Sequence, residues 1–406
     1  MQINKHFRNT RLFAIMLSIL LLCMAVLPVM TAAAFAGGDG SAKNPYLLRT
    51  AEDVNNIRKN LDAQYKLAAT IDMSSIKNFE PIGTGKDIVN AKPFTGSLKC
   101  DLGADGLPRY AILNLSVTNN IGKAYGYEFK SSNYAGFGDK GVHYTAALFA
   151  ETSGATFENI YILNANVVNT VPGQHAGIWD NEAQKYNMFS EQTEIQATAI
   201  LVARAKGTTI DRCGVQGKIN SLSTHTAALA GVIEEGSMVT RSWADIEMDT
   251  QGFWHVGAFV ASVKGSQVQY CYAKGSMHST SGASKGFNNG CAAAGFVNGA
   301  DETGVVSNCY TTVTLKSGGG VNYVGGFCYN TLTKKDQVMV GQVSNCYTSA
   351  VFEGDRTEVG TENANNNWVL NRKGALQIDF KGGTAEEIKA AFKNVKGWDV
   401  SGDCRH

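Results

Sequence analysis

Apolar and polar residues alternate over short stretches through most of this chain. In the segment 242–249, which reads SWADIEMD, every second residue is small or apolar, and the residues between them are Trp or acidic. Successive side chains of a β-strand point to opposite faces, so this alternation predicts a strand with one face toward a core and one toward solvent. The same phase assigns to the core Val215, Ile219, Met277, Val313 and Leu315.

Segments of this kind recur as internal repeats. Four copies of a small-apolar block, a Gly and a short strand begin at Ala146, Ala199, Ala228 and Gly257, and two looser copies follow them. The last three of these starting points are evenly spaced, and the first lies further away. Such regular repeats are typical of a stack of similar units that grows along one axis. The glycines that the four copies share are Gly154, Gly207, Gly236 and Gly265.

One core-facing position of the repeat carries Ile, Ser or Cys. The tetrapeptide Ser-Asn-Cys-Tyr occurs twice, at 307–310 and 344–347, and its Cys occupies this position both times. We therefore expect these residues at equivalent places on successive coils, about 4.8 Å apart. The positions are Ile160, Cys213, Ser242, Cys271, Cys309 and Cys346.

Composition and the chain ends complete the fold prediction. Gly is frequent, with 44 residues, and Pro is rare, with 6, as expected of many short strands and turns. Helical patterns follow two capping boxes, at 50–53 and 384–387, and a helix at each end would cover unpaired strand edges. We predict an all-β solenoid with a short capping helix near each end. Its parts are a capping region with the first coils at 37–118, repeats with two loop insertions at 119–353, and a last coil and capping helix at 354–406.

The first residues predict export. Three basic residues precede the apolar run 12–30, and the small-residue sequence TAAAFAGG follows it. This order is typical of a signal peptide, which we place at 1–36 with cleavage after Ala36. Cleavage would remove three of the 36 basic side chains and none of the 35 acidic ones, leaving a formal charge of −2. A near-neutral chain gives no electrostatic reason to expect nucleic acid or a membrane surface as a partner.

The cysteines allow two interpretations. They can form a buried ladder of small apolar side chains, or they can form disulfides, which an exported chain permits. No Cys-x-x-Cys pair occurs and the His residues are scattered, so we expect no metal site and no cofactor.

Acidic residues raise the question of catalysis, because parallel β-strand stacks also carry polysaccharide-cleaving enzymes that use clustered carboxylates. The best cluster is Asp245, Glu247 and Asp249 on one strand face. At an offset of one repeat, Lys218 lies opposite Glu247 and Lys274 lies opposite Asp245. Cross-strand charge pairing accounts for these groups, so we predict no catalytic residues.

Aromatic residues supply the candidate binding positions. The residue after each core-facing Cys or Ser should point outward, and an outward row of rings would either stack as scaffold or form an interaction strip. Two insertions, 119–143 and 169–196, also carry aromatic residues that either cover the coils or bind a ligand. The outward row is Tyr161, Gly214, Trp243, Tyr272, Tyr310 and Tyr347, and the loop candidates are Tyr125, Tyr127, Trp179 and Tyr186.

Several segments resemble bacterial GLUG-motif surface proteins. The entry region GGDGSAKNPYLLRTAEDVNNIRKNLDAQYKLAATIDMSS, with FEPIGT and FTGSL after it, is similar to theirs, although the Gly-Leu-x-Gly block is degenerate here. The resemblance implies a right-handed parallel β-helix in exported, often adhesive proteins. Related modules precede the protease domain of immunoglobulin-cleaving metallopeptidases, whose His-Glu-x-x-His motif this sequence lacks.

We therefore predict a secreted or cell-surface interaction protein, without enzymatic activity, that binds an extracellular glycan or a host or matrix protein. The alternative is a carbohydrate-active enzyme, a polysaccharide lyase or glycoside hydrolase, on the same kind of scaffold.

Overall fold

Among the residues that it describes, the computed structural model is all-β with one short α-helix, and most of the described strands run parallel. It describes residues 35–83, 92–119, 145–169, 197–223, 225–250, 255–280, 292–301, 303–318 and 323–328, and short strands at 178–180, 185–187, 333–334, 337–338, 342–344, 346–348, 351–354 and 380–382.

Four parallel sheets contain nearly all of the described strands, and we number them in the order in which a repeat passes through them. Sheet 1 consists of β12 (Ala197–Thr198), β16 (His225–Thr226), β20 (His255–Gly257), β24 (Ala292–Ala294) and β29 (Tyr323–Gly325). Sheet 2 consists of β7 (Phe149–Ser153), β13 (Val202–Lys206), β17 (Ala230–Glu234), β21 (Val260–Val263) and β25 (Val297–Ala300).

Sheets 3 and 4 extend further along the chain. Sheet 3 consists of β1 (Tyr46–Leu48), β2 (Gln64–Leu67), β4 (Ser97–Lys99), β8 (Thr156–Glu158), β14 (Thr209–Asp211), β18 (Met238–Thr240), β22 (Gln267–Gln269), β26 (Val305–Ser307) and β32 (Gln342–Ser344). Sheet 4 contains the longest strands and consists of β3 (Ile71–Asp72), β5 (Ala111–Leu113), β6 (Ser116–Asn119), β9 (Tyr161–Asn169), β15 (Gly214–Ser221), β19 (Trp243–Thr250), β23 (Tyr272–Thr280), β27 (Tyr310–Thr311), β28 (Thr314–Gly318), β33 (Cys346–Thr348), β34 (Val351–Gly354) and β35 (Phe380–Gly382).

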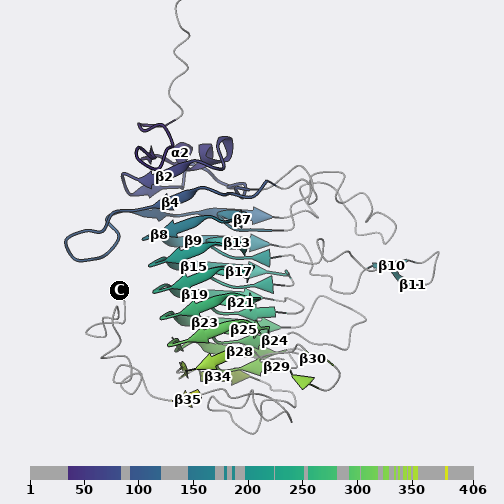
Figure 1. The fold of residues 1–406 in the computed structure, drawn as a ribbon. Helices are drawn as coiled ribbons and strands as arrows, with labels where there is room; N and C mark the ends of the chain where they lie inside the picture. Colours follow the sequence, from purple (N-terminus) through teal and green to yellow (C-terminus); the bar gives the residue numbers. More distant parts are fainter. Residues whose placement is uncertain are drawn as a thin grey trace, which may run out of the picture.

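Each central repeat adds one strand to every sheet. The chain passes from β12 through β13 and β14 to β15, and the next repeat begins at β16 beside β12. In sheet 4, Gly214 pairs with Trp243 and Trp243 with Tyr272, so the structural repeat has the same even spacing as the repeat in the sequence. Figure 1 shows the repeats stacked one above another along a single axis.

The core runs along the inside of this stack, as the alternation predicts. On β19, Ala244, Ile246 and Met248 are buried, whereas Glu247 and Asp249 are exposed. Residues at equivalent places also stack on one another: the rings of Phe259, Phe296 and Phe327 follow at centroid distances of 4.8 Å and 4.8 Å. The predicted core residues Val215, Ile219, Met277, Val313 and Leu315 are all buried.

A ladder of hydroxyl and thiol side chains lies inside the corner between sheets 3 and 4. The backbone N–H of each ladder residue donates to the side chain one repeat further on: Cys213 to Ser242 Oγ (3.0 Å), Ser242 to Cys271 Sγ (3.4 Å), and Cys271 to Cys309 Sγ (3.4 Å). The side chains of these four residues in turn donate to the carbonyl two residues earlier, for example Cys271 Sγ to Gln269 O at 3.1 Å. All ladder positions are buried, and the residues that directly follow them pair in parallel register from Trp243 to Tyr347. Burial and register together confirm the predicted equivalence of Ser242, Cys271, Cys309 and Cys346.

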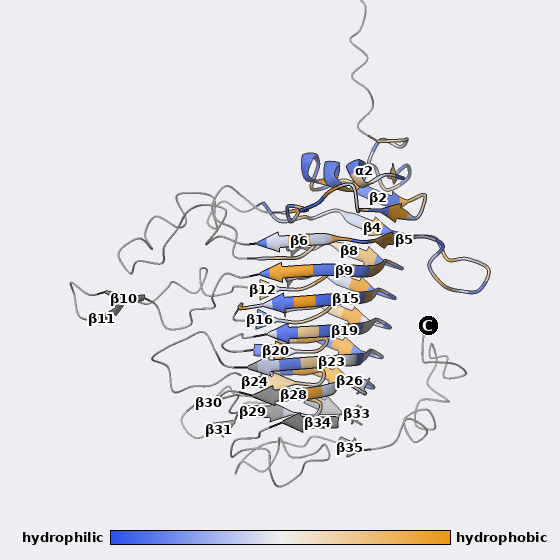
Figure 2. Cartoon of the chain, turned by 180° about the vertical axis from the view of Figure 1, so that it is seen from behind, coloured by the Kyte–Doolittle hydropathy of each residue, from blue (hydrophilic) through white to orange (hydrophobic). Residues whose placement is uncertain are grey.

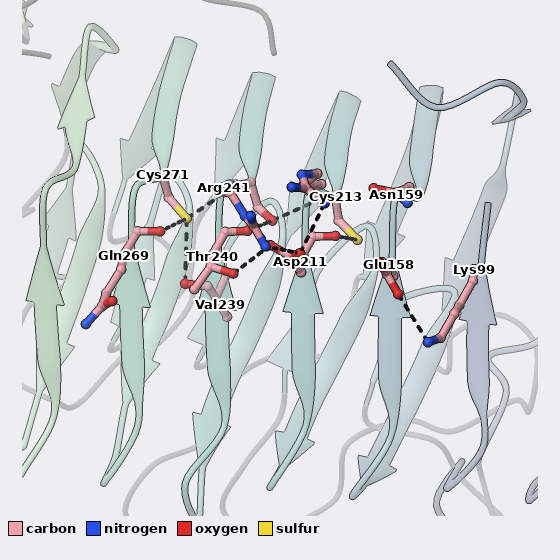
Figure 3. A network of polar contacts seen from close by, with 12 residues as sticks. Lys99, Glu158, Asn159, Asp211, Cys213, Val239, Thr240, Arg241, Gln269 and Cys271 are labelled. Atoms are coloured by element: carbon pink, nitrogen blue, oxygen red, sulfur yellow. Dashed lines mark hydrogen bonds and ion pairs between the residues drawn. The ribbon is translucent and has the colours of Figure 1, made fainter. Parts of the chain in front are cut away.

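The same corner requires a left-handed backbone. The described residues before the first five ladder positions, Ile160 to Cys309, have a positive φ between 49° and 59°, a conformation that Asn tolerates better than most side chains. Figure 3 shows how one of these corners is braced: the Arg241 guanidinium pairs with Asp211 of the preceding repeat, and Thr240 Oγ1 donates to the same carboxylate at 2.7 Å. The left-handed residues are Asn159, Arg212, Arg241, Tyr270 and Asn308.

The predicted N-terminal helix is present as α2 (Ala51–Asn56), which continues into a 3₁₀ turn at Ile57–Lys59. Its capping box is formed: Asp53 N–H donates to Thr50 Oγ1 at 3.1 Å, and Thr50 N–H donates to Asp53 Oδ2 at 2.9 Å. Figure 1 shows α2 at the end of the stack, beyond β4. The second predicted helix, after Thr384, lies outside the described residues, as does the segment 1–34.

Candidate functional site

The outer face of sheet 4 carries rows of charged side chains. Parallel register places Glu247 beside Lys218, and Lys218 Nζ lies 2.6 Å from Glu247 Oε2. The same register places Asp245 beside Lys274, at 3.5 Å. Both pairings agree with those expected from an offset of one repeat. Figure 2 shows β9, β15, β19 and β23 lying in order on this side, with polar and apolar residues alternating along them.

A third pair on this face was not foreseen from the sequence. His278 Nδ1 lies 3.3 Å from Asp249 Oδ1, because the two residues are register partners on β23 and β19. The offset of one repeat that identified the other two pairs would also have identified this one. Each carboxylate of the Asp245, Glu247 and Asp249 cluster therefore has a basic side chain or an imidazole beside it.

This outer face is hollowed. A depression of about 520 Å³ crosses five neighbouring strands, from β9 to β28. Lys218 and Glu247, which line the depression from β15 and β19, have side chains that are 66% and 65% exposed. Water therefore screens this ion pair, and it contributes little to stability. Either side chain can therefore give up its ion-pair partner and bind a ligand instead, at a small cost in free energy. The depression is lined by Asn166, Val168, Lys218, Ile219, Asn220, Glu247, Met248, Asp249, Ser276, Met277, His278 and Lys316.

The predicted aromatic row crosses the same sheet at the first residues of its strands. The rings of Tyr272 and Tyr310 stack at 5.1 Å between centroids, 5° from parallel, and Trp243 stacks on Tyr272 at 6.3 Å. Gly214 leaves a space in the row, and the Trp243 indole covers it and contacts Tyr161 edge to face at 5.2 Å. The rings are not an open strip, since Trp243, Tyr272 and Tyr310 are 7%, 1% and 4% exposed.

The structure brings together some of the other aromatic candidates. Trp179 is the register partner of Tyr186 in the antiparallel pair of β10 (Ile178–Asp180) and β11 (Lys185–Asn187). Tyr347 continues the aromatic row at the backbone level, as the register partner of Tyr310. Tyr125 and Tyr127 lie outside the described residues.

A second depression, of about 620 Å³, lies on the outer face of sheet 3 near its N-terminal end. Two ion pairs border it, Lys66–Asp101 at 2.7 Å and Lys99–Glu158 at 3.1 Å, and the second is visible in Figure 3. The four charges cancel, so this depression, like the first, has no net charge to favour an ionic ligand.

The described part of the chain contains neither a cluster of metal-binding side chains nor a helix suited to a membrane. No cluster of three or more His, Cys, Asp or Glu side chains there could hold a metal ion. Among the same residues, no helix combines the length and the apolar character that crossing a membrane requires.

Comparison with known proteins yields a similarity of fold. No protein-family profile matches the sequence, and no curated protein matches it. A crystal structure from Bacteroides ovatus, described as a candidate immunoglobulin A1 protease, superposes with a TM-score of 0.58 at 16% identity, covering 90% of this chain and 93% of that one. A structure named IgA1 protease gives a TM-score of 0.48 at 14% identity, and the match covers 85% of this chain but 24% of that one. At 16% identity, the similarity to the Bacteroides ovatus structure shows a shared fold and leaves the activity open.

Proposed function

We propose that this chain is an exported, non-catalytic binding protein whose stack of repeats is a right-handed parallel β-helix of the GLUG-like kind. The proposed ligand is an extracellular glycan or a host or matrix protein, held outside the producing cell or on its surface. The observation that carries the proposal is the hollowed outer face of sheet 4, where exposed polar side chains of both signs lie in register on a rigid scaffold. A rigid surface that offers donors and acceptors without net charge suits a neutral, hydroxyl-rich ligand.

The first test is a binding array of glycans and host proteins with the mature chain. Immunoglobulin A1 belongs among the probes, because a structural neighbour carries its name. For any ligand found, the double variant Lys218→Ala with Glu247→Ala should reduce the affinity by at least tenfold and leave the melting temperature nearly unchanged, since the pair is exposed.

A matched control comes from the other depression. Lys99→Ala with Glu158→Ala removes an exposed ion pair of the same kind from sheet 3 and should leave that affinity unchanged. A loss of binding in the control alone would move the site to sheet 3. An unchanged affinity in both double variants would mean that neither outer face is the binding site.

The alternative is a carbohydrate-active enzyme, and the observation in its favour is that Glu247 and Asp249 line one depression. A hydrolase of this kind needs one carboxyl as general acid and a second as base or nucleophile. Incubating the polysaccharides that bind with the wild type and with the variants Glu247→Gln and Asp249→Asn separates the two functions. Binding without release of shorter products supports the binding protein, whereas turnover that the variants abolish supports the enzyme.

A further inference from the structure

Phe35 is part of the hydrophobic core at the N-terminal end of the stack. It is 8% exposed, its ring stacks on Tyr46 at 4.4 Å between centroids, and it meets the edge of Tyr65 at 5.4 Å. Tyr65 is buried in turn and contacts Phe94 at 6.2 Å, which lies inside the stack. Phe35 is therefore the outermost member of a chain of aromatic rings that enters the core.

The backbone after Phe35 is also fixed on the first strand. Leu47 N–H donates to Gly37 O at 2.9 Å, and Asp39 N–H donates to Asn44 O at 2.9 Å, so residues 37–47 turn back along themselves. The Asp39 carboxylate accepts from Ser41 N–H at 2.9 Å and tightens this turn. Ala36, between the buried ring and the turn, is exposed.

The sequence around Phe35 contains two overlapping Ala-x-Ala signals for signal-peptide cleavage. Ala32-Ala33-Ala34 and Ala34-Phe35-Ala36 both have small residues at the first and third positions before a bond. The first would cut between Ala34 and Phe35, and the second between Ala36 and Gly37. Sequence alone favoured the second, but that cut would remove a core side chain from the folded protein.

We infer that the chain is processed at the bond between Ala34 and Phe35, and that Phe35, as the first residue of the mature protein, packs into the end of the stack. The step is a hydrolysis: water adds to the Ala34 carbonyl carbon, the bond to the Phe35 nitrogen breaks, and the products are an Ala34 carboxylate and a Phe35 amine. The inference shares with the proposed function only the premise of export and does not depend on any ligand.

N-terminal sequencing and the intact mass of the full chain, after export by a bacterial host, test this inference. The expected mature protein begins Phe35-Ala36-Gly37. A protein that begins at Gly37, lighter by one Phe and one Ala residue, would overturn it, and so would an exported chain that keeps residues before Phe35.

Two variants separate the competing bonds. Ala32→Leu places a bulky residue three positions before the proposed bond and should abolish chains that begin at Phe35, shifting the remaining processing to the bond between Ala36 and Gly37. Ala36→Leu lies after the proposed bond, at an exposed position, and should be processed normally at Phe35. The opposite pattern would assign the cut to the bond between Ala36 and Gly37.

A stability measurement tests the physical reason independently. Mature chains that begin at Phe35 and at Gly37 can be released from a fusion without extra residues and compared by thermal unfolding. The chain that lacks Phe35 should melt at a temperature several degrees lower, because Tyr46 and Tyr65 lose a packed ring. Equal melting temperatures would remove the basis of the inference.

Discussion

Where it is Ser or Cys, the side chain at the inner corner between sheets 3 and 4 satisfies two buried backbone groups, as Ser242 and Cys309 show. Its hydroxyl or thiol accepts the N–H of the preceding repeat and donates to the carbonyl two residues earlier. Ser and Cys both have this capacity and similar size, which explains why Ser242 can occupy a position that is otherwise Cys in the neighbouring repeats.

Cys271 provides a test of this hydrogen-bonding role. Cys271→Ser keeps an acceptor for the Ser242 N–H and a donor for Gln269 O, so its free energy of unfolding should stay within about 1 kcal/mol of the wild type. Cys271→Ala leaves the buried Ser242 N–H without that acceptor and should cost about 1–3 kcal/mol. Urea unfolding of the two variants measures the difference. An equal loss in both would mean that packing of the sulfur, rather than its hydrogen bonds, matters.

The thiols should also be unreactive in the folded protein. The six cysteines of the described residues are free and buried, and burial raises the pKa of Cys100, Cys213, Cys309 and Cys328 above the usual thiol range. Because the thiolate is the reactive form, iodoacetamide at pH 8 should modify their peptides in urea but not in buffer. Mass spectrometry of the digested protein reads this out, and recovery of a Cys271–Cys309 disulfide would contradict the ladder.

At the left-handed corners, the type of residue explains the backbone conformation at some positions but not at others. Asn308 sits in a conformation for which Asn has a known preference, so its position in Ser-Asn-Cys-Tyr has a local cause. Arg212, Arg241 and Tyr270 adopt the same conformation without such a preference. At these three residues the left-handed conformation is imposed by the stacking of the repeats. It therefore cannot be predicted from the residue types alone.

At the scale of the strand, the alternation of apolar and polar residues predicted the direction in which a side chain points but not its exposed fraction. The residues after the ladder do form an aromatic row on the outer phase of sheet 4, with Trp243, Tyr272 and Tyr310 stacked in order. Their burial depends on what lies over the strand, which a period of two cannot reveal. The charged pairs were predictable because both partners belong to repeats with the same spacing, and the shape of the depression was not, because it depends on side-chain lengths across five strands.

The aromatic row should therefore act as a stabilising element. Replacing Tyr272 or Tyr310 by Ala should each cost about 3–5 kcal/mol, as for other buried rings, and the double variant should show a coupling of about 0.5–1.5 kcal/mol because the rings stack. Ser276→Ala, on the outer face of the same strand, is the control and should change stability by less than about 0.5 kcal/mol. Chemical unfolding of the four proteins completes the cycle. A melting temperature that barely changes in the Tyr272 and Tyr310 double variant, together with lost ligand binding, would instead make the row a binding site.

At the scale of the whole molecule, each central repeat bonds to the repeats before and after it. In every sheet a strand pairs with the equivalent strand of the neighbouring repeat, as β15 does with β9 and β19, and β17 does with β13 and β21. The stability of such a stack is approximately a sum over repeats and their interfaces. The number of repeats can therefore be changed, provided that the strands of the remaining repeats keep their register.

Deleting one whole repeat, the segment 214–242, keeps that register, because Gly214 and Trp243 are partners at the same point of successive repeats. The deletion joins Cys213 to Trp243, brings β19 beside β9, and removes the glycine gap from the aromatic row. We expect a protein that unfolds cooperatively, with an unchanged β-type circular dichroism spectrum per residue and a smaller free energy of unfolding. Deleting only 214–228 removes β15 and β16 but leaves β17 and β18, so the sheets cannot continue together and the product should not fold. If both deletions fold equally well, or if neither does, stability does not reside in interfaces between equivalent repeats.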